Sequence, residues 1–335
     1  LEEPTLLVPG AVPLSLSLSL SLPSCLSASA KLRPLLPSLP PPVRDVDVPP
    51  LFREPYILSG YRPPGLPWRC YLLSLFQLHN ETLNVWSHLL AAVFSLQGPE
   101  GRGLSLDAAS LPLLLYVLSA LTYLSCSAAA HLLQAHSELA HYSLFFLDYV
   151  GVAIYQYGCA LALSVYSVFL PAAAILSWLS CTSCCVAKLC FRRPYPLCRK
   201  LCQVVPLGVA YLLDVSPLAH RLATTPVSSL HQVALFLLAA CFFSCPVPER
   251  CSPGRYDVIG HAHQLFHLLL ALCTLAQQEA LFHDFLSRRP ALLRRFGEER
   301  LLLACASFPC LALCSALTAL TMRGRARARL KKEQR

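Results

Sequence analysis

Leu301–Met322, LLLACASFPCLALCSALTALTM, is a run of 22 residues without a charged side chain. A helix of that length, which rises about 1.5 Å per residue, crosses a hydrocarbon layer of roughly 30 Å. A soluble helix with no polar face over such a length would be unusual. The run therefore predicts a membrane-spanning helix.

The composition of the whole chain favours the same environment. Of its 335 residues, 13% are charged and 55% are hydrophobic, and the mean hydropathy is +0.53. A soluble domain carries about 25% charged residues, so this chain has too little polar surface to cover a globule in water. We expect an all-α, polytopic transmembrane helical bundle. Its eight predicted spans are 73–96, 111–131, 145–164, 168–187, 203–220, 231–247, 261–283 and 301–322.

The first 70 residues differ from the rest. They hold 15 of the 28 prolines and an alternating Leu/Ser tract, Leu14–Leu22. Such low-complexity sequence is typical of extended or disordered chain. Glu2 and Glu3 stand where a signal peptide has basic residues, so we do not expect a signal peptide. The predicted regions are a Pro-rich cytosolic region 1–70, a transmembrane domain 71–322 and a basic cytosolic tail 323–335.

The distribution of Lys and Arg predicts the orientation, because these residues are retained on the cytosolic side. Eight spans with a cytosolic N-terminus place 20 Lys and Arg residues in the cytosol and 7 outside. Both termini are therefore predicted to be cytosolic. The third and fourth spans have almost no polar loop between them, so one long helix remains an alternative. With one long helix there, every later loop would lie on the opposite side of the membrane.

The first group of polar residues within the spans is Glu81, Asn84 and His88. Offsets of three and four residues place them on one face of a helix. Polar side chains in hydrocarbon usually face the bundle interior and mark function. A role in a ligand cavity and a structural role in hydrogen bonds between helices both fit this group.

Two further groups of polar residues, Ser127, His131 and Asp148, and then His263 and His267, suggest a metal site. His263 and His267 are four residues apart, the spacing by which one helix offers two imidazoles to zinc. His131 at the end of another span would complete a three-histidine set with an open fourth position, as in catalytic zinc sites. Ser127 shares a helical face with His131, and Asp148 could orient a ligand or a water. The alternative is a stack of core histidines without a metal.

Seventeen cysteines add a weaker signal. Many of them, such as Cys159 and Cys273, lie in apolar runs, where cysteine behaves as a small hydrophobic residue. Six others form a cluster whose spacing is irregular for a zinc ribbon, so packing and juxtamembrane palmitoylation are the favoured readings. They are Cys181, Cys184, Cys185, Cys190, Cys198 and Cys202.

These groups together resemble the signature of the progestin and adipoQ receptor family, which is related to haemolysin III proteins and alkaline ceramidases. The pattern is Glu-x2-Asn-x3-His, then Ser-x3-His followed by Asp, then His-x3-His, and the chain contains all of it. The resemblance implies a seven-helix core plus an eighth C-terminal span. It also implies Zn²⁺ held by His131, His263 and His267, with Asp148 near the zinc-bound water.

The resemblance further implies a plasma-membrane receptor for progesterone-type steroids or another amphiphilic lipid, which signals through an inhibitory heterotrimeric G protein. The alternative is a zinc-dependent intramembrane lipid amide hydrolase of the ceramidase type, in which Asp148 and Ser127 would be catalytic. Enzyme activity is thus left open. The lipid bilayer is the expected surrounding, and no nucleic-acid partner is expected.

Overall fold

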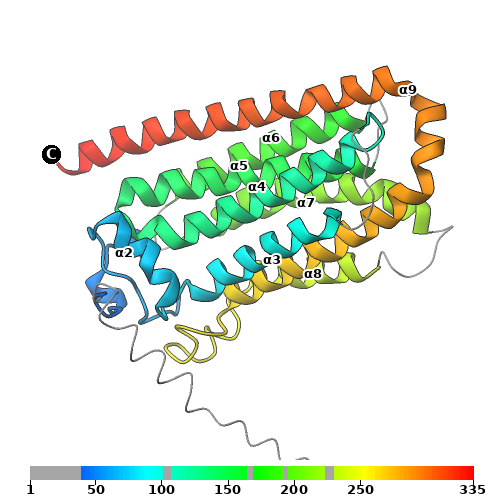
Figure 1. Cartoon of the computed structure of the whole chain (residues 1–335). Helices are drawn as coiled ribbons and strands as arrows, with labels where there is room; N and C mark the ends of the chain where they lie inside the picture. Colours follow the sequence, from blue (N-terminus) through cyan, green and yellow to red (C-terminus); the bar gives the residue numbers. More distant parts are fainter. Residues whose placement is uncertain (1–38, 101–106, 164–168, 192–194, 223–229) are drawn as a thin grey trace, which may run out of the picture. The chain divides into compact units, whose positions relative to one another are not determined.

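A computed structural model describes residues 39–100, 107–163, 169–191, 195–222 and 230–335 (Figure 1). The described residues are mostly helical, and their one β-bridge joins Val43 and Tyr61. The α-helices are α2 (Trp68–Leu73), α3 (Thr82–Glu100), α4 (Leu111–Leu133), α5 (Glu138–Leu163), α6 (Phe169–Cys190), α7 (Leu197–Leu222), α8 (Leu230–Ser244) and α9 (Ala262–Glu333).

The predicted helical membrane bundle is confirmed. Among the described residues, five helices are long and apolar enough to cross a membrane: Leu111–His136, Glu138–Leu163, Phe169–Cys190, Ala262–Ser287 and Gly297–Glu333. Helix α8 is also apolar but shorter. Helices α3 and α7 correspond to the first and fifth predicted spans.

The predicted third and fourth spans are two helices. Helix α5 ends at Leu163 and α6 begins at Phe169, and the two helices pack against each other. One continuous helix cannot contact itself in this way, so that alternative is wrong. Helix α5 also begins at Glu138, earlier than predicted, which places Asp148 well inside the helix instead of near its start.

The first predicted span begins later than expected. The chain forms α2 and a 3-10 turn (Ser74–Phe76), and α3 starts only at Thr82. The break is held by hydrogen bonds: His79 N–H donates to Thr82 Oγ1, and Asn80 N–H donates to the Gly60 carbonyl. Glu81 therefore precedes α3 by one residue, and only Asn84 and His88 lie within it.

Residues 41–70 also differ from the expected extended chain. They contain two 3-10 helices, Asp45–Asp47 and Pro50–Phe52, and a small apolar cluster that includes Val48, Phe52 and Tyr61. We call residues 41–65 the pre-helix segment. Residues 1–38, for which disorder was predicted, lie outside the described residues.

Helix α9 consists of two parts. At Gly297, φ is +70° and ψ is 164°, a conformation that favours glycine and interrupts the helix. The second part, which contains the predicted span Leu301–Met322, runs back along the bundle to the C-terminus (Figure 1). Phe308 and Leu311 of this part join the apolar core of α5 and α6.

Candidate metal centre

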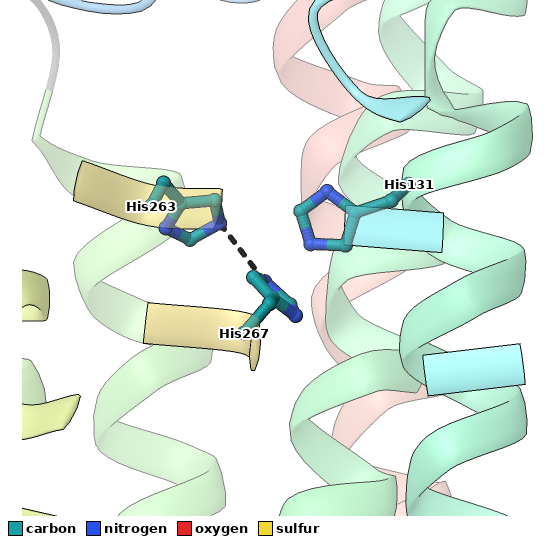
Figure 2. Close-up of side chains that lie close together, drawn as sticks. All are labelled: His131, His263 and His267. Carbon is teal, nitrogen blue, oxygen red and sulfur yellow. Dashed lines mark hydrogen bonds between the residues drawn. The ribbon is translucent and has the colours of Figure 1, made fainter. Parts of the chain in front are cut away.

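Three histidines from two helices meet inside the bundle. His131 lies in the last turn of α4, and His263 and His267 lie in the first two turns of α9. One ligand nitrogen from each lies within 4.8 Å of the other two. Figure 2 shows the His131 ring facing the pair formed by His263 and His267. Among the described residues this is the only group of His, Cys, Asp or Glu side chains that meets at such distances.

The spacing of the three nitrogens suits a tetrahedral metal. Two nitrogens bound to one zinc at about 2.0–2.1 Å lie about 3.3 Å apart. The Nε2 atoms of His263 and His267 are 3.2 Å apart, which is already that separation. The ligand nitrogen of His131 lies within 4.8 Å of the other two, so a rotation of its side chain could close the set.

Glu81 sets the protonation of His131. His131 Nδ1 lies 2.7 Å from Glu81 Oε2, and both side chains are buried. A carboxylate only accepts hydrogen bonds, so Nδ1 carries the proton and Nε2 keeps a lone pair. Within the described part of the chain, Nε2 is buried and has no hydrogen-bond partner. An unpaired lone pair in an apolar bundle costs free energy, and a metal ion would satisfy it.

Glu81 is itself held by two amides. Asn84 Nδ2 donates to Oε2 at 2.5 Å, and Gln134 Nε2 donates to Oε1 at 3.1 Å. The Oε1 of Gln134 in turn contacts His141 Nδ1. This chain of contacts is the carboxylate–histidine arrangement that commonly supports a metal ligand. The sequence assigned the ligand-orienting role to Asp148, but the carboxylate that contacts a histidine of the set is Glu81.

His267 has a comparable support. Its Nδ1 lies 3.0 Å from His88 Nε2, which also lies 3.3 Å from the Tyr123 hydroxyl. If His267 Nδ1 donates to His88, the Nε2 of His267 is free for the metal. His88 thus contacts a histidine of the set directly, and Asn84 contacts Glu81, which contacts His131. The cavity role and the structural role predicted for them stay predictions.

Asp148 lies near the set without joining it. Its carboxylate is buried in α5, interacts electrostatically with His131, and lies within hydrogen-bonding reach of Ser127. In the described structure its Oδ1 atom has no hydrogen-bond partner. A carboxylate with a free oxygen at this place can accept a proton from water or ligand. The catalytic roles predicted for Asp148 and Ser127 stay predictions.

Three buried residues of the network were not singled out in the sequence: Gln134, His141 and Tyr123. Two of them left a signal in the sequence, since Gln134 follows His131 by three residues and His141 lies in an apolar helix. The six clustered cysteines, in contrast, do not form a group of ligand atoms at metal-binding distance among the described residues.

The chain matches the haemolysin-III related family over residues 76–278, which include every residue of the set. It belongs to this family. Human membrane progestin receptor beta is 50% identical over 323 aligned residues, which cover 89% of this chain and 91% of the relative. Membrane progestin receptor alpha from Cynoscion nebulosus is 48% identical, covering 88% and 90% of the two chains. Membrane progestin receptor alpha-B from Danio rerio is 46% identical, covering 89% and 91%.

These relatives confirm the resemblance to the progestin and adipoQ receptor family. Together with the apolar helices, they identify the chain as an integral multi-pass membrane protein.

Proposed function

We propose that this chain is a plasma-membrane receptor for a progesterone-type steroid, built around a zinc site that His131, His263 and His267 form. The observation that carries the proposal is the buried, unpartnered Nε2 of His131 beside a histidine pair at ligand spacing. The names of the relatives, which are membrane progestin receptors that cover most of both chains, support the steroid as ligand.

The residues suit an amphiphilic ligand with one polar end. The histidines and Glu81 form a polar centre, and the helices around it are rich in buried apolar side chains, such as Val85 in α3 and Leu124 in α4. Ligand sites of this kind combine apolar walls with a few placed polar groups. A steroid that enters from the bilayer would keep its rings among apolar side chains and its oxygen at the polar centre.

The signalling partner is an inhibitory heterotrimeric G protein, and both termini are cytosolic. The excess of basic residues in the predicted cytosolic parts supports the orientation of the termini. The family resemblance supports the G protein as partner. In the described structure the basic residues Arg323–Lys332 extend α9 beyond its apolar part to Glu333. Such a helix end suits an anionic cytosolic leaflet.

One observation favours a second function, hydrolysis of a lipid amide. The Asp148 carboxylate has a free oxygen, lies near His131, and has Ser127 beside it. A bound zinc ion would supply a Lewis acid that acidifies water and polarises a carbonyl. Asp148 would then accept a proton from water, and Ser127 would donate a hydrogen bond to the developing oxyanion.

The two functions separate in one assay on the purified full chain in detergent. For the receptor we expect saturable binding of radiolabelled progesterone, reduced in the His263→Ala/His267→Ala variant, and no release of fatty acid from ceramide. Release that disappears in Asp148→Asn would identify the hydrolase. Saturable binding that the double variant leaves unchanged would refute a role of the histidines in ligand binding.

A further inference from the structure

The pre-helix segment makes hydrogen bonds to the end of α4 and to the loop that precedes α9, the two helices that carry the histidines. On one side Arg62 reaches the end of α4. On the other side Leu58 N–H and Ser59 Oγ donate to the carboxylate of Asp257, in the loop before α9, at 3.0 and 2.6 Å. A segment outside the membrane-spanning helices is therefore bonded to the elements that bring the histidines together.

Arg62 makes the most direct of these contacts. It is 4% exposed, and its Nη2 donates to the His131 carbonyl at 2.6 Å. Its Nη1 donates to the Leu132 carbonyl and, at 3.0 Å, to Ser74 Oγ. The last carbonyls of a helix have no partner within it and carry partial negative charge. Arg62 thus binds the backbone of the very residue whose imidazole faces His263 and His267.

Arg62 also acts on the side chain of His131 indirectly. Its charge interacts with that of Glu81, whose Oε2 accepts the hydrogen bond from His131 Nδ1. Burial lowers the pKa of Arg62 to about 10, and the Glu81 charge acts in the opposite direction. The guanidinium therefore remains charged at neutral pH. A single buried cation thus binds the carbonyl of His131 and interacts electrostatically with the carboxylate that accepts the hydrogen bond from His131 Nδ1.

The pre-helix segment, the residues before α3 and the start of α9 are closely packed and joined by hydrogen bonds. The Asn80 carbonyl accepts hydrogen bonds from His261 Nε2 at 3.0 Å and from Gln264 Nε2 at 2.9 Å. Gly60 has φ of +84°, and a Cβ there would lie 3.2 Å from both Asn80 N and Val258 Cγ2. A side chain at this position would press on the backbone at Asn80 and on Val258, so the segment packs closely against the chain before α3 and the loop before α9.

We propose that Arg62 is a positioning residue of the histidine site, which holds the His131-bearing end of α4 so that Nε2 faces His263 and His267. The proposal rests on the proposed metal centre. It differs from a simple helix-capping role, because a cap stabilises the fold without affecting metal affinity or ligand geometry.

Arg53 provides a matched control. Its Nε and Nη2 both donate to the Val48 carbonyl, at 3.1 and 2.9 Å. Arg53 thus lies in the same segment and also binds a backbone carbonyl, but both of these hydrogen bonds stay within the segment. Arg53→Met removes the same chemistry without touching α4.

The test uses the purified full chain in detergent. Zinc affinity is measured by competition with a chelator, the visible spectrum of the Co²⁺-loaded protein reports ligand geometry, and a thermal melt of the metal-free protein reports stability. We expect Arg62→Met to weaken zinc binding by about tenfold or more and to change the Co²⁺ spectrum. We expect Arg53→Met to leave both the zinc affinity and the Co²⁺ spectrum unchanged. The zinc affinity of Arg62→Lys, which keeps the charge, should lie between those of Arg62→Met and the unchanged protein.

The outcomes distinguish a positioning role of Arg62 from a helix-capping role. A lower melting temperature of Arg62→Met with unchanged zinc affinity and Co²⁺ spectrum would overturn the inference and leave Arg62 as a helix cap. If Arg62→Met does not fold, Arg62→Lys carries the test, and affinity and spectrum equal to those of the unchanged protein would overturn the inference. If the unchanged chain binds no metal through His131, both the proposed centre and the inference fail.

Discussion

Glu81→Gln keeps the size of the side chain and removes its charge. In the structure, Glu81 accepts three hydrogen bonds: from His131 Nδ1 at 2.7 Å, from Asn84 Nδ2 at 2.5 Å and from Gln134 Nε2 at 3.1 Å. A glutamine has one accepting oxygen and one donating amide group. At least one of the three donors must therefore lose its acceptor or face another donor.

The network has little freedom to absorb this change. If the glutamine oxygen stays with His131 and Asn84, its amide group faces the amide group of Gln134. Gln134 could turn over only by giving up the contact between its oxygen and His141 Nδ1. Loss of such a supporting partner typically lowers metal affinity by about 10–100-fold. The corresponding loss of binding free energy is about 1.4 to 2.8 kcal/mol.

Zinc affinity of the purified chain, measured by chelator competition, checks this prediction. Glu279→Gln is the matched control, because Glu279 contacts His283 at 3.1 Å on an exposed part of α9, far along the helix from His267. We expect that control to leave zinc affinity unchanged. Glu81→Gln affinity within twofold of the unchanged chain would refute the claim that Glu81 supports a metal ligand.

Three further predictions concern catalysis, packing and topology. Asp148→Asn should fold and retain most of its zinc but lose most hydrolysis or ligand response; unchanged activity and unchanged response would make Asp148 a buried hydrogen-bonding group only. Gly158→Ala should destabilise the protein by about 1–3 kcal/mol, because its Cβ would meet Ser119 Cβ at 2.7 Å between α4 and α5. In contrast, Gly208→Ala in α7, where a Cβ meets nothing within 4 Å, should be neutral or stabilising in the same thermal melt. Epitope tags at both termini should be detected only in permeabilised cells, and a C-terminal tag seen on intact cells would contradict the predicted orientation.

The helical bundle could be predicted from the sequence because the deciding signals are local. Apolar runs such as Leu301–Met322 decide a helix by themselves, and the spacing of His263 and His267 places two imidazoles on one face. His131, at the end of another span, was predicted to complete a three-histidine set, and the family resemblance implied the same assignment. The structure brings the three together as expected.

The supports of the site could not be predicted, because they join residues far apart in the chain. Glu81 and His131 are 50 residues apart, and His88 and His267 are 179 apart. The break before Thr82 depends on hydrogen bonds from Asn80 to Gly60 and from α9 to Asn80, which no local pattern reveals. Arg62 was hidden by its place in a Pro-rich stretch that the sequence assigned to extended chain.

The most direct test of the central claim is the zinc content of the purified chain, measured by elemental analysis after removal of loosely bound metal. The account predicts about one zinc per chain, because three imidazoles with an open fourth position favour zinc over oxygen-preferring metals. It predicts loss of that zinc in the His263→Ala/His267→Ala variant and full retention in His283→Ala, which changes an exposed histidine of the same helix. Full zinc content in the double variant would contradict the account and make the cysteines between Cys181 and Cys202 the site to examine.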